Sequence, residues 1–223
     1  IRSASEALPT LRAFRDFAAA APDEFCGLLA LVHAPPLPFL EARWYGRPVL
    51  ITAVCWCGEP AAGERAMLGL RKSGASLADH IGLMPYVQWN HLQDAGAPAG
   101  RFQYWKSVSY ETLPDSILET LASRLESLPT PQTEIHVQHL GGAVARVPEQ
   151  DTAFVQRMTG FFVNLIGATP WIDGYEGLRT EVRALHASLL HGALPAPLSN
   201  FSDQDDGSVD SQIGPATRRC AEV

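Results

Sequence analysis

The chain has 223 residues, of which 46% are hydrophobic and 18% charged, and its formal net charge at pH 7 is −7. This composition supplies enough apolar side chains for a core, so it excludes global disorder. The acidic balance argues against nucleic-acid binding, and no apolar run approaches the roughly 18 residues of a membrane-spanning helix. We therefore expect neither a nucleic acid nor a membrane as partner.

The first residue is Ile1 rather than Met, so we expect the chain to be part of a longer sequence. A signal peptide would then lie upstream and would not be visible here. The compartment therefore stays open, with the cytoplasm favoured.

The predicted elements follow from hydrophobic periodicity and from Pro and Gly positions. In chain order they are a helix over 8–18, strands over 25–33 and 48–57, a helix over 61–72, a loop over 85–101, a strand over 102–108, a helix over 113–128, a strand over 134–138 that resumes as far as 147, a strand over 161–166 and a helix over 175–190. Residues 1–198 are expected to form one α+β domain: an antiparallel sheet of six or seven strands with helices packed on one face. Residues 199–223 read as an acidic loop and the start of a C-terminal segment.

The four cysteines, Cys26, Cys55, Cys57 and Cys220, are too few for a disulfide framework. Cys55 and Cys57 form a C-x-C on a predicted strand, which puts both side chains on one face. No further Cys or His pair has zinc-type spacing. We expect reduced, structural cysteines, with Cys55 and Cys57 packed in the core and no metal site; metal or redox chemistry at the C-x-C is the alternative.

The strand over 134–138 alternates between polar and apolar residues. Glu134, His136 and Gln138 share one face, and Ile135 and Val137 share the other. Helices must bury the apolar face. The polar face is left for solvent, a second domain or a ligand, and periodicity alone does not choose between them.

Motif searches exclude several function classes. The sequence has no G-x-G-x-x-G after a strand, no phosphate loop and no G-x-S-x-G turn. A Cys–His nucleophile built from Cys55 and His136 has no support from spacing.

Five short motifs occur in a suggestive order along the chain. They are Tyr104-Trp105-Lys106-Ser107, Leu113-Pro114-Asp115, Leu140-Gly141-Gly142-Ala143, Val147-Pro148 and Asp151-Thr152-Ala153-Phe154-Val155-Gln156-Arg157. Their order and spacing resemble the C-terminal region of berberine-bridge-type FAD-linked oxidases. The resemblance covers residues 7–223.

The resemblance implies that the chain is the substrate-binding half of an FAD-dependent oxidoreductase, whose partner is an N-terminal flavin domain absent from this chain. The open face of the sheet would line the pocket for a small alcohol, amine or sugar-like substrate. His136 and Lys106 are the expected catalytic acid/base groups, and Tyr104, Gln138, Asn164 and Asn200 the expected substrate contacts. We expect Tyr104, Lys106, His136 and Gln138 to share one exposed face.

Two departures from the family pattern weaken the catalytic interpretation. The His and Cys that anchor the flavin covalently in that family have no counterpart here, and Leu198 stands where the family usually has a Tyr. The chain alone is therefore expected to bind FAD poorly and to be inactive. The alternative is a detached, non-catalytic small-molecule-binding or interaction module derived from the same family.

Overall fold

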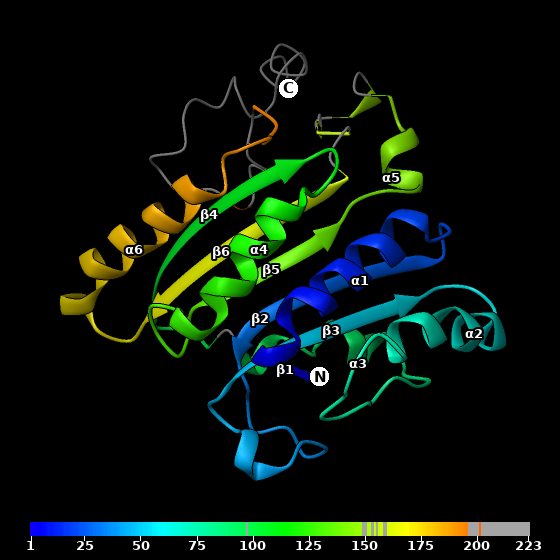
Figure 1. Cartoon of the computed structure of the whole chain (residues 1–223), viewed down its shortest axis with the longest axis horizontal. Helices are drawn as coiled ribbons and strands as arrows, with labels where there is room; N and C mark the ends of the chain where they lie inside the picture. The colour runs from blue at the N-terminus through cyan, green and yellow to red at the C-terminus, as the bar shows by residue number, and fades with distance from the viewer. Residues whose placement is uncertain are drawn as a thin grey trace.

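The computed structural model has one six-stranded antiparallel sheet with its long helices on one face, which confirms the predicted α+β class (Figure 1). The structure describes residues 1–96, 98–148, 151, 152, 154, 156, 157, 160–195 and 201. The acidic segment beyond residue 201, together with Leu198 and Asn200, lies outside the described residues.

The sheet runs in the order β1-β3-β2-β5-β6-β4, and every neighbouring pair is antiparallel. Its strands are β1 (Arg2–Ser3), β2 (Phe25–His33), β3 (Pro48–Trp56), β4 (Phe102–Tyr110), β5 (Glu134–His139) and β6 (Phe161–Thr169). The short β5 lies in the middle of the sheet, between β2 and β6. Residues on it are therefore flanked by strands on both sides.

Four helices supply the covering layer: α1 (Ala7–Ala20), α2 (Pro60–Arg71), α4 (Asp115–Arg124) and α6 (Tyr175–Ser188). In Figure 1, α1, α4 and α6 lie across the near side of the sheet, and α6 runs along β4 and β6. Within the described residues, no helix is long and apolar enough to cross a membrane.

Local sequence explains where these helices begin and end. Pro22 follows α1, Pro60 opens α2, and Pro114 precedes α4, whose first residue is the acidic Asp115. Proline fits the first turn of a helix, where its missing N–H is not needed, and a carboxylate there interacts favourably with the helix dipole.

Three local predictions were wrong. The two-residue β1 was missed, the predicted loop over 85–101 contains the short helix α3 (Tyr86–Asn90), and the strand expected to resume as far as 147 is instead the short helix α5 (Ala143–Arg146). Gly142 precedes α5 with a φ of 65°. Glycine adopts this left-handed conformation without a steric cost, and it ends the extended path of β5.

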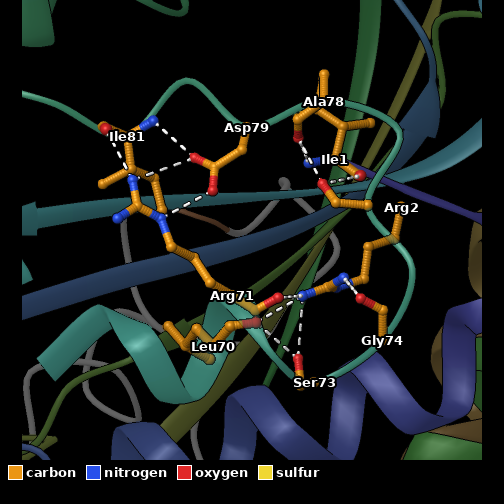
Figure 2. A network of polar contacts seen from close by, with 10 residues as sticks. Ile1, Arg2, Leu70, Arg71, Ser73, Gly74, Ala78, Asp79 and Ile81 are labelled. Atoms are coloured by element: carbon orange, nitrogen blue, oxygen red, sulfur yellow. Dashed lines mark hydrogen bonds and ion pairs between the residues drawn. The ribbon is translucent and has the colours of Figure 1, made fainter. Parts of the chain in front are cut away.

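The N-terminal strand is held by a network of polar contacts around Arg2 (Figure 2). The buried Arg2 guanidinium donates to the carbonyl oxygen of Leu70, in the last turn of α2, and to that of Gly74 just beyond it. A cation at this position satisfies carbonyls that a helix end leaves unpaired. Nearby, Arg71 pairs with Asp79 at 2.8 Å and fixes the segment that follows α2.

The core lies between the sheet and the four helices. Alternate strand residues supply its sheet side, among them Leu29, Leu31, Tyr104, Val108, Ile135, Val137, Val163 and Leu165. A smaller apolar cluster lies on the other face, at the end of β2 and β3, where residues 34–44 and 77–78 pack against Ala30, Val32 and Val49. We call this other side of the sheet the helix-free face.

Candidate functional site

A transverse row of polar side chains crosses the centre of the helix-free face. His136 on β5 pairs with Asn164 on β6, and Asn164 pairs with Ser107 on β4. Directly paired residues of an antiparallel sheet point to the same side. The next residues along the strands, Val137 and Val163, belong to the helix-side core. We call His136, Asn164 and Ser107 the polar row.

His136 is held by a carboxylate from its own strand. Its Nε2 lies 2.8 Å from Oε2 of Glu134, two residues earlier on the same face. A carboxylate oxygen accepts hydrogen bonds, so Nε2 is the donor to Glu134, and in a neutral imidazole Nδ1 is then left as the acceptor. The His136 side chain is 9% exposed and that of Glu134 32%. The pair thus combines an enclosed imidazole with a partly solvated partner that fixes its tautomer.

Three buried polar atoms of this face lack a partner among the described residues. They are Oδ1 of Asn164 and the hydroxyls of Ser107 and Ser109. Leaving a buried polar group unpaired costs about 1–3 kcal/mol, and few such groups occur in native proteins. These three atoms lie on two adjacent strands, where they can form hydrogen bonds with a polar ligand or with water.

Aromatic rings flank the polar row. The ring of Phe201 lies 5.9 Å from that of Trp105 and 4.9 Å from that of Phe162. Trp105 precedes Ser107 by two residues and Phe162 precedes Asn164 by two, so both rings share the helix-free face. Apolar and aromatic walls with a few orienting polar groups are typical of small-molecule sites.

The structure separates Tyr104 and Lys106 from the other expected site residues. Both are buried on the helix side, and Arg183 of α6 donates to the Tyr104 hydroxyl at 2.9 Å. Lys106 pairs with Leu165, a helix-side core residue, and its Nζ lies 5.4 Å from the centre of the Tyr104 ring. The expectation that these two share the face of His136 was wrong.

Of the remaining expected site residues, Gln138 and Asn164 lie on the face of His136. Gln138 is directly opposite Phe162, and Asn164 is in the polar row. Asn200 lies outside the described residues. The expected exposed patch was also wrong, because His136 is only 7% exposed.

Sequence reasoning missed Ser107, Ser109 and Trp105, although a signal was available. Along 102–110 one alternating set is largely aromatic or apolar (Phe102, Tyr104, Val108 and Tyr110), and the other contains Gln103, Trp105, Ser107 and Ser109. The more apolar set belongs under helices. Lys106 concealed this pattern, because a lysine at a core position is rare.

Comparison with known proteins gives a clear result at the level of structure. No family model and no curated protein matches this sequence. A solved BBE-like protein of Physcomitrella patens matches with a TM-score of 0.75 at 12% identity, over 100% of this chain and 48% of that one. A chitooligosaccharide oxidase matches with a TM-score of 0.70 at 15% identity, over 98% of this chain and 49% of that one.

A third solved structure, 6-hydroxy-D-nicotine oxidase of Arthrobacter nicotinovorans, gives a TM-score of 0.65 at 18% identity, over 93% of this chain and 44% of that one. The chain has the fold of about half of each of these three solved proteins. The resemblance inferred from the sequence motifs is confirmed at this level. The chain spans about half the length of the solved proteins that it matches.

Proposed function

We propose that this chain is the substrate-recognition half of an FAD-dependent oxidoreductase, and that the helix-free face is the wall of its substrate pocket. The observation that carries the proposal is the polar row. An enclosed imidazole, oriented by a carboxylate, lies beside buried amide and hydroxyl groups without partners. In the family that the chain resembles, the cofactor is FAD and the substrates are small molecules.

The described residues suit the substrate side of such a site better than the cofactor side. No G-x-G-x-x-G segment leads from a strand into a helix to bind a pyrophosphate at the helix N-terminus. The polar row instead offers hydrogen-bonding groups on a sheet face, flanked by the aromatic side chains Trp105, Phe162 and Phe201. We therefore expect FAD to be held mainly by a partner domain.

Within this proposal, bound FAD would accept a hydride from the substrate carbon. The proton of the substrate hydroxyl or amine would pass to Nδ1 of His136, because Glu134 holds the other ring nitrogen in its protonated form. Asn164 and Ser107 would orient the substrate through their unpaired oxygens. Burial of the row would exclude water from the transfer.

One observation favours a second candidate, a detached binding module without catalysis. Leu198 stands where the family usually has a Tyr, so one expected catalytic group is missing. A binding module would keep the polar row and aromatic walls for ligand recognition. It would need neither the acid/base role of His136 nor a flavin partner.

The test is to read the coding sequence on both sides of residues 1–223 and to express the whole product. Flavin reduction by small alcohols, amines and sugars would then be followed by stopped-flow absorbance. We expect His136→Ala to slow flavin reduction by roughly 10²–10⁴-fold, the usual contribution of an acid/base group.

His139→Ala is the matched control. His139 is on the same strand but pairs with Phe161 of the helix-side core, and burial lowers its pKa. Its loss should leave the rate of flavin reduction nearly unchanged. Equal rates for His136→Ala and the parent protein would remove the acid/base role, and a product without a flavin domain would favour the binding module.

A further inference from the structure

Three thiols lie together on the helix-free face, at the end of β2 and β3 that is remote from the small apolar cluster. Cys26 pairs directly with Cys55, and Cys57 follows just past the end of β3. The sulfur atoms of Cys55 and Cys57 are 3.9 Å apart. The expectation that these cysteines pack in the core was wrong: Cys26 and Cys57 are exposed and Cys55 is half-buried, because the helices cover only the other face.

Cys55 and Cys26 are poor nucleophiles, because burial and the neighbouring thiols raise the pKa of each. Burial, then the hydrogen bond with Cys57 and the neighbouring Cys57 and Cys26, together raise the pKa of Cys55 to about 11. Burial, and then the neighbouring Cys57, also raise the pKa of Cys26. A high pKa leaves little thiolate at neutral pH, so nucleophilic catalysis is disfavoured.

The spacing fits sulfur atoms that share one ion. Three sulfurs arranged in a plane at about 2.3 Å from an ion lie about 4 Å from one another. The 3.9 Å between Cys55 and Cys57 matches one edge of this triangle. A disulfide would need a separation of about 2.05 Å.

The third corner requires a small rearrangement. In the part of the chain that the structure describes, no three His, Cys, Asp or Glu side chains are already placed as a metal-ligand set. Cys26 must therefore rotate about its χ1 angle to bring its sulfur to the ion. The residue is directly paired with Cys55 and its side chain is exposed, so it is free to turn toward that neighbour.

We propose that Cys55 and Cys57, joined by Cys26, form a binding site for a soft, monovalent cation of the Cu(I) type. Thiolates select soft ions, and Cu(I) accepts two or three of them. Structural zinc takes four ligands, one more than this group supplies. Each thiol that binds releases one proton to solvent, and the ion keeps its oxidation state.

The experiment titrates the reduced chain with Cu(I) under anaerobic conditions, against a chromophoric Cu(I) chelator. A Cys220→Ser background leaves only the three thiols of the site. We expect one Cu(I) per chain, with an affinity that rises with pH because protons are released. Cys55→Ser and Cys57→Ser should each weaken binding by about 100-fold or more, since even changes around metal ligands cost 10–100-fold.

Ala53→Ser is the matched control, because residue 53 lies on the same strand and face, two residues before Cys55. It should leave the affinity unchanged, and circular dichroism would verify that each variant is folded. Binding that survives the loss of Cys55 or Cys57 would overturn the proposal. A reduced chain that binds no Cu(I) would also overturn the proposal. In that case, a loss of two mass units and of the free thiols on exposure to air would show that the thiols form a disulfide instead.

Discussion

The two faces of the sheet differ in what they bury, although the same strands supply both. On the helix side, Val137, Val163 and Leu165 pack into a continuous apolar core. On the helix-free side, their neighbours His136 and Asn164 are almost equally buried but polar. Apolar burial contributes to folding stability, whereas burial of polar groups has to be offset by hydrogen bonds. One face is therefore built for stability and the other carries a cost that suits a binding site.

Two buried polar groups, one from each face, differ in the same way. On the helix side, the buried hydroxyl of Tyr110 donates to the carbonyl oxygen of Leu189, at the end of α6. On the helix-free side, Oδ1 of Asn164 has no partner among the described residues. The first group is satisfied within the chain, and the second would be satisfied by a ligand or water.

The largest expected effect on stability is on the helix side. Leu165→Ala should lower the free energy of unfolding by about 2–5 kcal/mol, because it leaves a cavity beneath the helices. Urea denaturation of parent and variant would measure the change. A loss below about 1 kcal/mol would mean that this face is less tightly packed than the structure shows.

A smaller loss is expected for Tyr110→Phe. The substitution keeps the ring but leaves the buried Leu189 carbonyl without its donor, which should cost about 1–3 kcal/mol. The same denaturation experiment applies. Since burial raises the pKa of the Tyr110 phenol, the parent protein should also resist ionisation of this group when absorbance is followed at high pH.

The polar row should respond in the opposite direction. Asn164→Leu replaces an unpaired buried oxygen with apolar atoms of similar size, so stability should stay the same or rise by about 1 kcal/mol. In the whole product the same variant should slow flavin reduction. A clear loss of stability would show that Asn164 contributes to folding and is not reserved for a ligand.

Strand parity could be predicted from the sequence, but only within one strand. Alternation placed His136 and Gln138 together and Ile135 and Val137 opposite, and the structure agrees. Alternation could not say which face of one strand lies on the same side of the sheet as a given face of its neighbour. That depends on the pairing register between strands, as between Lys106 and Leu165. A register shift by one residue would put every side chain of the strand on the other face.

Interactions set by distant segments were also invisible. The contacts of Phe201 with Trp105 and Phe162 join residues that are far apart in the sequence, so no local pattern predicts them. Cys55 and Cys57 were predicted to pack in the core, and the sequence of β3 is apolar on both faces, a pattern typical of strands covered on two sides. Here β3 lies next to the edge strand β1 and is covered by helices on one side only.

The smallest effect is expected at the outer surface of the helix layer, where Asp115 of α4 bridges to α1. Asp115 pairs with Arg15 and, at 2.9 Å, with Arg12. The hydrogen bond from Arg15, with the charge of Arg12, holds the pKa of Asp115 below its usual range. The folded state therefore binds a proton at this carboxylate less readily than the unfolded state does. The resulting stabilisation is present at neutral pH and is lost as the pH falls through the lowered pKa.

Asp115→Asn should lower the melting temperature slightly at neutral pH, and the difference from the parent should shrink on acidification. High salt should shrink it as well, because the pair is exposed and screened. Glu41→Gln is the matched control: its carboxylate pairs with Arg43 at 3.0 Å, two residues along the same exposed segment, and joins no two helices. A bridge between α1 and α4 should give a larger change than this local pair. Identical melting profiles for the two variants would mean that the helix layer is held by its apolar side chains alone.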